Sequence, residues 1–384
     1  MTSTVGIVGL GEAGNLGDDL ILIAAVAAVS SAADVMVRHL SSGHKINWDV
    51  LPVPLRLADQ VESVAKTWEL PGARWPDRAF EDVAAIVFGG GGLLQDVHHP
   101  YRPYHWLRFL PSGRNVPTLA VGIGLGPLGE GWRKRFAARP MPFDACFVRD
   151  GDSAALARSL GWRVDRCRDF VDGDFLRLFL NPETLDRRSS RLGVSLRAWP
   201  GLTPKRVAES IASVAHREGL KEVNFFVLED RNGGPDRDFT QAVMDLLGES
   251  LDSRMHAYSA ANIPVFIEQM STCSVALSMK LHASAIWNSL GVAVYPVIYA
   301  PKIAALFGRP YRGLEIVDQR ETTPQPEEVL RAEDVVKQWL QAGKHAEITP
   351  KWRLTRIERL VFQARATATD MVRMGLTHEG GVRA

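Results

Sequence analysis

The chain has 384 residues, with 45 Lys and Arg against 44 Asp and Glu, and its formal net charge is +1. That length predicts two domains, each large enough to bury a core, and an apolar content of 46% excludes global disorder. A net charge this close to zero gives no overall attraction for nucleic acid or for an anionic membrane, so an anionic ligand must be bound by a local pocket.

The cysteines, the histidines and the apolar segments further limit which class of protein this is and which kinds of site it can contain. The three cysteines include no CxxC pair, so neither a disulfide framework nor a structural zinc site is expected. Around His98, His99 and His105 no carboxylate or cysteine completes a convincing ligand set, so no metal is expected either. The most apolar window, Leu20 to Val29, is roughly half the length of a membrane span. With no secretory signal in the first residues, we expect a cytoplasmic protein without a transmembrane segment.

Short apolar runs alternate with helical stretches along the first third of the chain. Strands are predicted at residues 5–9, 35–38, 84–89, 117–124 and 145–149, and helices at 17–29 and 152–161. Each strand is apolar throughout, which is typical of strands covered on both faces in a parallel sheet. The alternation therefore predicts an open α/β sheet.

A polar segment at residues 181–191 separates this region from a second one of the same kind. There the patterns predict strands at 192–197, 223–228, 274–278 and 292–297, and helices at 204–218, 238–249, 282–290, 327–341 and 350–374. We therefore predict an α/β protein with two Rossmann-like domains, residues 1–185 and 190–325, that face each other across a cleft. Residues 326–384 are expected to form C-terminal helices that pack back on the first domain.

Four consecutive glycines, Gly89, Gly90, Gly91 and Gly92, directly follow a predicted strand. Because they lack side chains, their backbone N–H groups can approach a ligand closely or adopt positive φ. At the carboxyl end of a parallel strand this arrangement favours a loop that binds a phosphate or a sugar. The alternative is a tight strand-to-helix turn without a ligand.

A second glycine pattern, Gly9, Gly11 and Gly14, fits the fingerprint of nicotinamide-dependent Rossmann enzymes. Residues 15–19 separate these glycines from the helix, and no acidic residue ends the second strand. A dehydrogenase is therefore disfavoured.

Cations and one imidazole follow the strands of the second region. Lys280 and His282 stand two residues apart after one strand, where both side chains can point into the cleft. Arg197 closes another strand, and Tyr299 and Lys302 follow a third. Because ligands of open α/β sheets bind at the carboxyl ends of the strands, these residues predict an anion site. His282 is the candidate general acid, and a capping or packed histidine is the alternative.

Taken in order, segments spread over residues 5–310 resemble the polysaccharide pyruvyl transferase family. The first half contributes Asn15-Leu-Gly-Asp18, the glycine run, Gly122-Ile-Gly-Leu-Gly-Pro127 and Arg149-Asp150 with Ser153. The second half contributes Gly193-Val-Ser-Leu-Arg197, Lys280-Leu-His282-Ala, Gly291 and Tyr299-Ala-Pro-Lys302. The resemblance depends on the ordered set and not on any single motif.

The resemblance implies a fold similar to that of glycosyltransferases of the B type, with the active site between the domains. It implies that the pyruvyl unit of phosphoenolpyruvate moves onto hydroxyls of a sugar, usually as a cyclic ketal, in the synthesis of a cell-surface polysaccharide. The partners are then phosphoenolpyruvate, as co-substrate and with no further cofactor, and a sugar, glycolipid or polysaccharide precursor.

The resemblance also suggests roles for individual residues. His282 matches the family's proposed general acid, and Arg197 matches an arginine that binds phosphoenolpyruvate. We expect Lys280, Lys302 and Tyr299 to complete the donor site, and an acceptor or phosphate loop formed by Asn15, Asp18, Gly89 to Gly92 and Arg149. One position departs from the family pattern, because Lys280 stands where family members have arginine. Lysine lacks the planar fork that binds a carboxylate or phosphate with two hydrogen bonds.

Two other functions remain open. A glycosyltransferase of the same architecture would bind a nucleotide sugar and would need an acidic residue at the ribose, for which Glu229 and Asp230 are the candidates. The other is a glycan- or anion-binding protein that has lost catalysis, and Lys280 is the residue that favours it.

Overall fold

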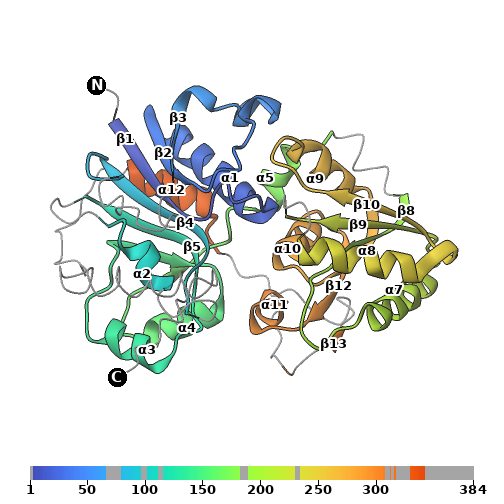
Figure 1. Ribbon diagram of the computed structural model, residues 1–384. Helices are drawn as coiled ribbons and strands as arrows, with labels where there is room; N and C mark the ends of the chain where they lie inside the picture. Colours follow the sequence, from blue (N-terminus) through green and yellow to red (C-terminus); the bar gives the residue numbers. More distant parts are fainter. Residues whose placement is uncertain are drawn as a thin grey trace, which may run out of the picture.

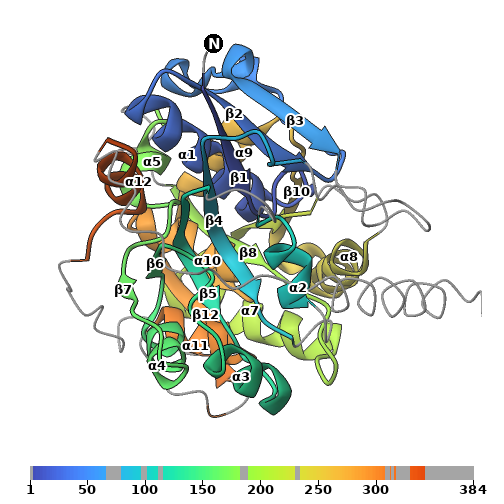
Figure 2. The same cartoon turned by 90° about the vertical axis from the view of Figure 1, so that its left-hand side faces the viewer.

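The computed structural model describes residues 3–65, 79–96, 102–110, 116–181, 189–229, 234–307, 312, 315–316 and 329–341. For Ala65, Arg102, Tyr104, Pro301, Lys302 and Ala305 it describes the backbone alone. Two α/β domains lie side by side, each built on its own sheet (Figure 1). In a view turned by 90°, the first domain lies in front of the second (Figure 2).

The sheet of the first domain is parallel and has the strand order β3-β2-β1-β4-β5-β6-β7. Its strands are β1 (Ser3–Val8), β2 (Val35–Ser41), β3 (Val61–Ala65), β4 (Ala85–Leu94), β5 (Thr118–Leu125), β6 (Ala145–Val148) and β7 (Asp165–Arg166). The order of the strands reverses between β1 and β4. Open α/β sheets bind their ligands at such a reversal, beyond the carboxyl ends of the strands.

Helices cover both faces of this sheet. They are α1 (Leu16–Ala32), α2 (Arg102–Leu107), α3 (Glu130–Ala137), α4 (Gly151–Ser159), α5 (Gly173–Arg177) and α12 (Ala332–Gln341), with 3₁₀ turns at Trp48–Val50, Val53–Leu55 and Ala58–Gln60. Along β4, Val87 belongs to the apolar cluster that contains α1, whereas Ile86 and Phe88 belong to a second cluster. The strand is therefore buried on both faces, which explains its continuous apolar sequence. Helix α12 comes from the C-terminal part of the chain and contacts α1 and β5.

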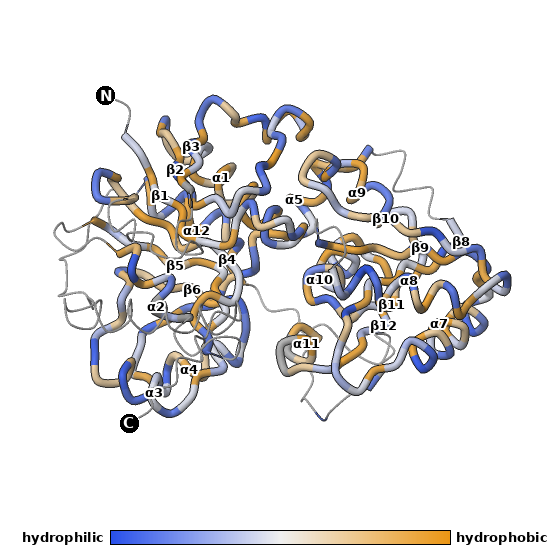
Figure 3. Tube along the Cα trace, viewed as in Figure 1, coloured by the Kyte–Doolittle hydropathy of each residue, from blue (hydrophilic) through white to orange (hydrophobic). Residues whose placement is uncertain are grey.

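The second domain repeats this plan with the strand order β10-β9-β8-β11-β12-β13. Its strands are β8 (Ser189–Ser195), β9 (Glu222–Val227), β10 (Asp252–Ala257), β11 (Cys273–Ser278), β12 (Ala293–Ile298) and β13 (Glu315–Ile316). All pairs are parallel except that of β12 with β13. The central strands of both sheets are hydrophobic along much of their length (Figure 3). The alternation of strands and helices thus confirms the predicted fold class of two Rossmann-like sheets.

One helix of the second domain faces the first domain. The helices are α7 (Pro204–Glu218), α8 (Pro235–Leu247), α9 (Ile263–Ser271), α10 (Leu281–Ser289) and α11 (Pro301–Leu306), with a 3₁₀ turn at Gly248–Ser250. Helix α10 contacts α1 and α5 of the first domain. Across the described residues, none of the helices is long and apolar enough to span a bilayer.

Four strands, β3, β7, β10 and β13, are not predicted by the sequence patterns. Among the described strands β10 pairs with β9 alone, and each of its residues is exposed or partly buried. Strand β3 occupies the opposite edge of the first sheet. An edge strand has a neighbouring strand on one side alone and is less completely covered than a central strand, so its sequence can lack the continuous apolar run. The helix predicted at residues 350–374 lies outside the described residues.

Helix α1 joins the two domains. Its first residue, Leu16, donates its backbone N–H to the carbonyl of Leu228 at 3.0 Å, directly after β9. One turn on, the buried Tyr258 hydroxyl donates a hydrogen bond of 2.6 Å to Oδ2 of the buried Asp19. The apolar cluster around α1 continues into the second sheet. The beginning of α1 is therefore held against the second domain, where the strands of both sheets end.

Candidate active site

A cavity of about 420 Å³ lies between the domains, and we call it the central chamber. The predicted site residues that line it are Asn15, Asp18, Gly91, Gly92, Arg149, Arg197, Lys280, His282 and Tyr299. They come from the beginning of α1, from β4, and from segments that follow β6, β8, β11 and β12. The chamber thus occupies the carboxyl ends of both sheets, where α/β proteins bind their ligands.

Two of the four glycines do not line this chamber. The glycine run is not a loop after β4 but part of the strand, which continues to Leu94. A Cβ on Gly89 would lie 3.3 Å from Ala25 Cβ, and one on Gly90 would lie 2.4 Å from Ile21 Cγ2. Gly89 and Gly90 therefore allow α1 to pack closely on the strand. The prediction of a ligand-binding loop is therefore wrong: the four glycines belong to strand β4, and of these four Gly91 and Gly92 line the central chamber.

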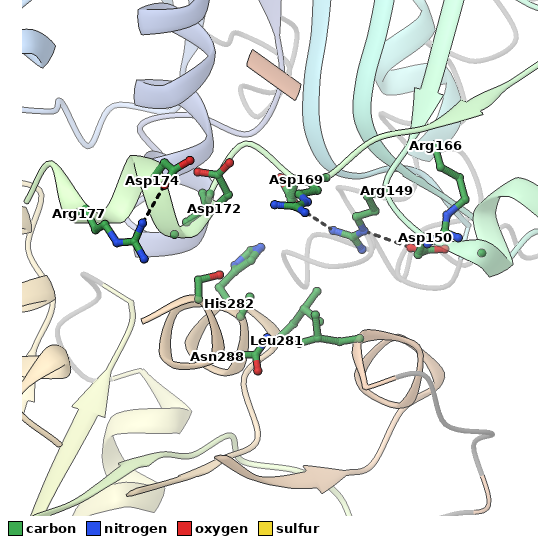
Figure 4. Close-up of a pocket in the computed structure, with 17 residues that line it drawn as sticks. Arg149, Asp150, Arg166, Asp169, Asp172, Asp174, Arg177, Leu281, His282 and Asn288 are labelled. Atoms are coloured by element: carbon green, nitrogen blue, oxygen red, sulfur yellow. Dashed lines mark hydrogen bonds and ion pairs between the residues drawn. The ribbon is translucent and has the colours of Figure 1, made fainter. Parts of the chain in front are cut away.

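The imidazole of His282 lies against the first turn of α1. An ideal Cβ on Gly17 would come within 1.9 Å of His282 Nδ1 and 2.0 Å of its Cγ, so only glycine leaves room for the ring. His282 is the second residue of α10, and the ring points from α10 toward the first domain (Figure 4). Gly17 is thus a site residue that motif reading overlooks. Its signal in the sequence is the glycine within Asn15-Leu-Gly-Asp18.

Arg197 follows β8 and is held by two aromatic rings. Its guanidinium forms a hydrogen bond with the Tyr299 hydroxyl, and its Cζ lies 5.8 Å from the centroid of the Trp199 ring. The two rings lie 4.5 Å apart. Burial raises the pKa of Tyr299, with Arg197 partly opposing the shift, so the phenol stays neutral. No carboxylate among the described residues forms an ion pair with Arg197.

Lys280 is a buried cation between two carboxylates. Its Nζ donates to Glu229 Oε1 at 2.9 Å and to Asp236 Oδ2. Asp236 Oδ1 accepts the backbone N–H of Ala198 at 2.8 Å, next to Arg197 in the chain. Lys280 is only 7% exposed, in keeping with the rule that buried charges are paired. The ion pairs therefore compensate its charge, and Asp236, which the sequence did not suggest, links Lys280 to the segment that carries Arg197.

A second cavity of about 600 Å³, which we call the arginine chamber, adjoins the first (Figure 4). Arg149, Leu281 and His282 line both cavities, so His282 lies where they meet. The remaining lining residues are Asp150, Gly151, Arg166, Arg168, Asp169, Val171, Asp172, Gly173, Asp174, Arg177, Ala285, Asn288, Ser289 and Leu306. The sequence patterns do not predict this second chamber, although Arg149 and His282 are among the predicted site residues.

Arg149 forms part of the boundary between the chambers. Its Nε lies 3.3 Å from Asp150 Oδ2, and its Nη1 lies 3.9 Å from Asp169 Oδ2. A Cβ on Gly124 of β5 would lie 3.0 Å from Nη2, so this glycine lets the guanidinium rest on the strand. Arg149 is therefore a partly compensated cation that reaches both chambers.

Other predicted candidates lie elsewhere. A Cβ on Gly9 would meet the Gly89 carbonyl at 3.0 Å, and one on Gly11 would meet Leu22 Cδ2 at 2.5 Å, so the apparent dinucleotide fingerprint serves packing. The side chain of Lys302 and residues His98 and His99 lie outside the described part of the structure. Within that part, no three His, Cys, Asp or Glu side chains are grouped closely enough to hold a metal ion.

Two Rossmann-like domains with a site between them define the glycosyltransferase B type of fold, and solved structures share it. The S. aureus MnaA–UDP co-structure has 9% sequence identity and a TM-score of 0.53, covering 88% of this chain and 88% of that chain. A putative UDP-N-acetylglucosamine 2-epimerase from Listeria monocytogenes has 9% identity and a TM-score of 0.55, covering 91% and 99%. Identities this low establish the fold alone.

The sequence itself identifies the family. A search of curated proteins finds no match. The family model of polysaccharide pyruvyl transferase, however, matches residues 15–299, from the N-cap of α1 to the tyrosine that holds Arg197. The chain therefore belongs to the polysaccharide pyruvyl transferase family, which is a family of transferases acting on polysaccharide.

Proposed function

We propose that this protein transfers the pyruvyl unit of phosphoenolpyruvate to hydroxyls of a sugar or glycan. The observation that carries the proposal is the central chamber, where one cavity is lined by an imidazole and by a guanidinium that has no carboxylate partner in the described part of the chain. An anion clamp and a proton donor are the two groups that the reaction needs.

Arg197 is the residue best placed to bind the donor. Its aromatic partners hold the guanidinium in place without neutralising it. A preorganised guanidinium can bind a carboxylate or a phosphate with two parallel hydrogen bonds. Arg149 adds a second cation, partly compensated by Asp150 and Asp169. Lys280 instead serves mainly as a positioning residue, because Glu229 and Asp236 already compensate its charge.

The proposed reaction begins with protonation of phosphoenolpyruvate. His282 gives a proton to the methylene carbon, which becomes a methyl group, and the neighbouring carbon becomes oxocarbenium-like. A sugar hydroxyl attacks that carbon and forms a C–O bond. The bond between that carbon and the phosphate oxygen then breaks, and the oxygen keeps the electron pair. A second sugar hydroxyl attacks the same carbon and closes the ketal. Of the two protons that the hydroxyls release, one restores His282 and the other leaves with inorganic phosphate.

Incubation of the protein with phosphoenolpyruvate and a panel of sugars and glycan precursors tests this function. We expect release of inorganic phosphate that depends on the acceptor, and a product heavier than the acceptor by one pyruvate less one water. Phosphate release without such a product, or no phosphoenolpyruvate binding in a thermal-shift titration, would contradict the proposal.

The nucleotide-sugar alternative depends on an acidic residue that could bind a ribose. Glu229 lines the central chamber, but Lys280 Nζ holds its Oε1 at 2.9 Å. Asp230 lies outside the described residues. The described geometry thus gives this alternative less support than phosphoenolpyruvate. Product mass separates the two functions, because a glycosyltransferase adds a hexose less one water.

Lys280→Arg restores the residue that is typical of the family and tests the positioning role. Because Glu229 and Asp236 hold the cation at this position, we expect the Kd for phosphoenolpyruvate to change by less than about threefold, which corresponds to less than about 1 kcal/mol. Isothermal titration with phosphoenolpyruvate measures this. Tightening by more than about tenfold would mean that position 280 binds the donor directly.

A further inference from the structure

The first turns of two helices meet at the imidazole of His282. His282 is the second residue of α10, and its ring lies against Gly17, the second residue of α1. The first turn of α10 contains no acidic residue. Because the N-terminal end of a helix carries a partial positive charge, a second positive charge beside it is disfavoured. Both helix ends therefore act against protonation of this imidazole unless a carboxylate offsets them.

Cations of the central chamber act in the same direction. Arg149 lines both chambers, as His282 does, and Arg197 lines the central chamber with them. A general acid, however, must hold its proton until the substrate takes it. An opposite charge close to a histidine favours the protonated form of its ring. The role of general acid at this position therefore requires a carboxylate near the imidazole.

Asp18 is the carboxylate that α1 provides there. It directly follows Gly17, the residue against which the ring lies, and consecutive Cα atoms are about 3.8 Å apart. Asp18 lines the central chamber together with His282 and is partly buried, so solvent screens its charge less than at an open surface. The next residue, Asp19, is buried and accepts a hydrogen bond from Tyr258 instead. Of the two acidic residues in this turn, Asp18 is therefore the one that shares a cavity with the imidazole.

The carboxylates of α5, the other helix of the first domain that contacts α10, have partners of their own. Asp172 is the N-cap of α5, and its Oδ1 accepts the N–H of Phe175 at 2.9 Å. Its Oδ2 lies 2.7 Å from Arg331 Nε. Asp174 Oδ1 pairs with Arg177 at 2.9 Å. These ion pairs reduce the influence of both carboxylates on His282.

Two further carboxylates of the chambers also lie beside cations. Lys280 Nζ lies 2.9 Å from Glu229 Oε1, and Arg149 Nη1 lies 3.9 Å from Asp169 Oδ2. Desolvation raises the pKa of Asp169, an effect that Arg149 partly opposes. The side chain of Lys302, on α11, lies outside the described part of the structure. Asp18 is thus the acidic group whose place in the fold best matches the need of the imidazole.

We propose that Asp18 is a positioning residue that keeps His282 protonated and ready to act as the general acid. The inference rests on the proposed function, in which His282 gives its proton to the methylene carbon of phosphoenolpyruvate. Asp18 stays ionised throughout and takes up no proton. It stabilises the imidazolium before the transfer, and it favours the return of a proton to the ring from a sugar hydroxyl afterwards.

A titration of His282 by nuclear magnetic resonance tests the inference without any substrate. The full chain is labelled at its histidines, and the resonance of His282 is the one that His282→Gln removes. Asp18→Asn and Asp18→Ser both remove the charge, so in each we expect the imidazole to lose its proton about one pH unit lower than in the wild type. Asp18→Glu keeps the charge and should stay within about 0.3 unit of the wild type.

Asp152→Asn is the matched control for these variants. Asp152 also stands in the first turn of a helix, α4, but it is exposed and lines neither chamber. It should leave the titration of His282 unchanged. Asp174→Asn tests the carboxylates of the arginine chamber and should shift the titration less than Asp18→Asn does. A shift below about 0.3 unit in both charge-removing variants of Asp18, or an equal shift in Asp174→Asn, would overturn the inference.

The pH dependence of turnover gives a second readout. The kcat of the wild type should fall as the pH rises through the titration of the imidazole, and in Asp18→Asn this fall should begin about one unit lower. The Kd for phosphoenolpyruvate should stay within about threefold of the wild type, because Asp18 acts through His282. A loss of donor affinity of more than about tenfold would mean that Asp18 maintains the donor site itself, and the inference would be wrong.

Failure of the proposed function looks different. In that case the wild type releases no phosphate from phosphoenolpyruvate with any acceptor, while the titration of His282 still depends on the charge of Asp18.

Discussion

Substitution of Gly17 by alanine is expected to lower kcat for pyruvyl transfer at least about 100-fold, because a displacement of about 1 Å at a reacting group can cost that much. The new Cβ would lie within 2.0 Å of His282 Nδ1 and Cγ, so the imidazole must leave its position against α1. Alanine is also a better helix former than glycine, by about 1 kcal/mol, which favours retention of α1. We therefore expect a folded protein that binds phosphoenolpyruvate but turns over slowly. Phosphate release and a thermal-shift titration measure the two properties separately.

A double-mutant cycle with His282→Gln shows whether the effect passes through the imidazole. His282→Gln should itself lower kcat by about 10²–10⁴-fold, the usual contribution of a general acid. The double variant should then be no slower than His282→Gln, because both changes remove the same group. Gly131→Ala is the control, since no atom lies within 4 Å of the position of its Cβ. Additive losses would mean that Gly17→Ala acts on something other than the imidazole, and a Gly17→Ala enzyme within threefold of the wild-type rate would mean that transfer does not need the imidazole in its position against α1.

Substitution of Asp19 by asparagine is expected to stabilise the protein in a pH-dependent way. Burial raises the pKa of Asp19 from 3.8 to about 7, with the Tyr258 hydrogen bond partly opposing the shift. The folded state therefore keeps a proton that the unfolded state loses near pH 3.8. The stability of the wild type falls as the pH rises from 3.8 to about 7 and stays low above that. Each pKa unit corresponds to about 1.4 kcal/mol, so the total loss is about 4 kcal/mol.

Asparagine resembles the protonated carboxyl group and should not lose stability over this range. Urea unfolding at pH 4 and pH 8 should show the advantage of Asp19→Asn over the wild type growing by about 4 kcal/mol between the two. Asp34→Asn is the control, because an exposed carboxylate is solvated in both the folded and the unfolded state. An Asp19→Asn advantage that is the same at both pH values would mean that this carboxyl group is ionised in the folded protein.

Part of the site follows from the sequence because of one property of parallel sheets. Arg197, His282 and Tyr299 each come shortly after an apolar run, and the carboxyl ends of parallel strands meet at one edge. That rule alone predicts that these three residues share a cavity, as they do in the structure. The rule predicts less well where a strand ends. In the structure β4 continues through the glycine run, so Gly89 and Gly90 lie beneath α1.

The charge state of the site does not follow from the sequence in the same way. Lys280 is separated from its partner Glu229 by 51 residues and from Asp236 by 44, and no local pattern reports these pairs. Arg331 is separated from Asp172 by 159 residues. In the sequence all of these cations look equally available to a ligand, whereas in the folded protein Lys280 and Arg331 are held in ion pairs and Arg197 forms none with the residues that the structure describes.

The sequence by itself determined the family, the two sheets and the strand ends at which the candidate site residues lie, because hydrophobic periodicity and short motifs are local properties of a chain. Only the tertiary structure decided which cations are compensated, where the imidazole of His282 lies, and that the inter-domain cleft has two chambers. Those features depend on distances between segments far apart in the chain, and these distances are set only when α1 and α10 pack against each other across the two domains.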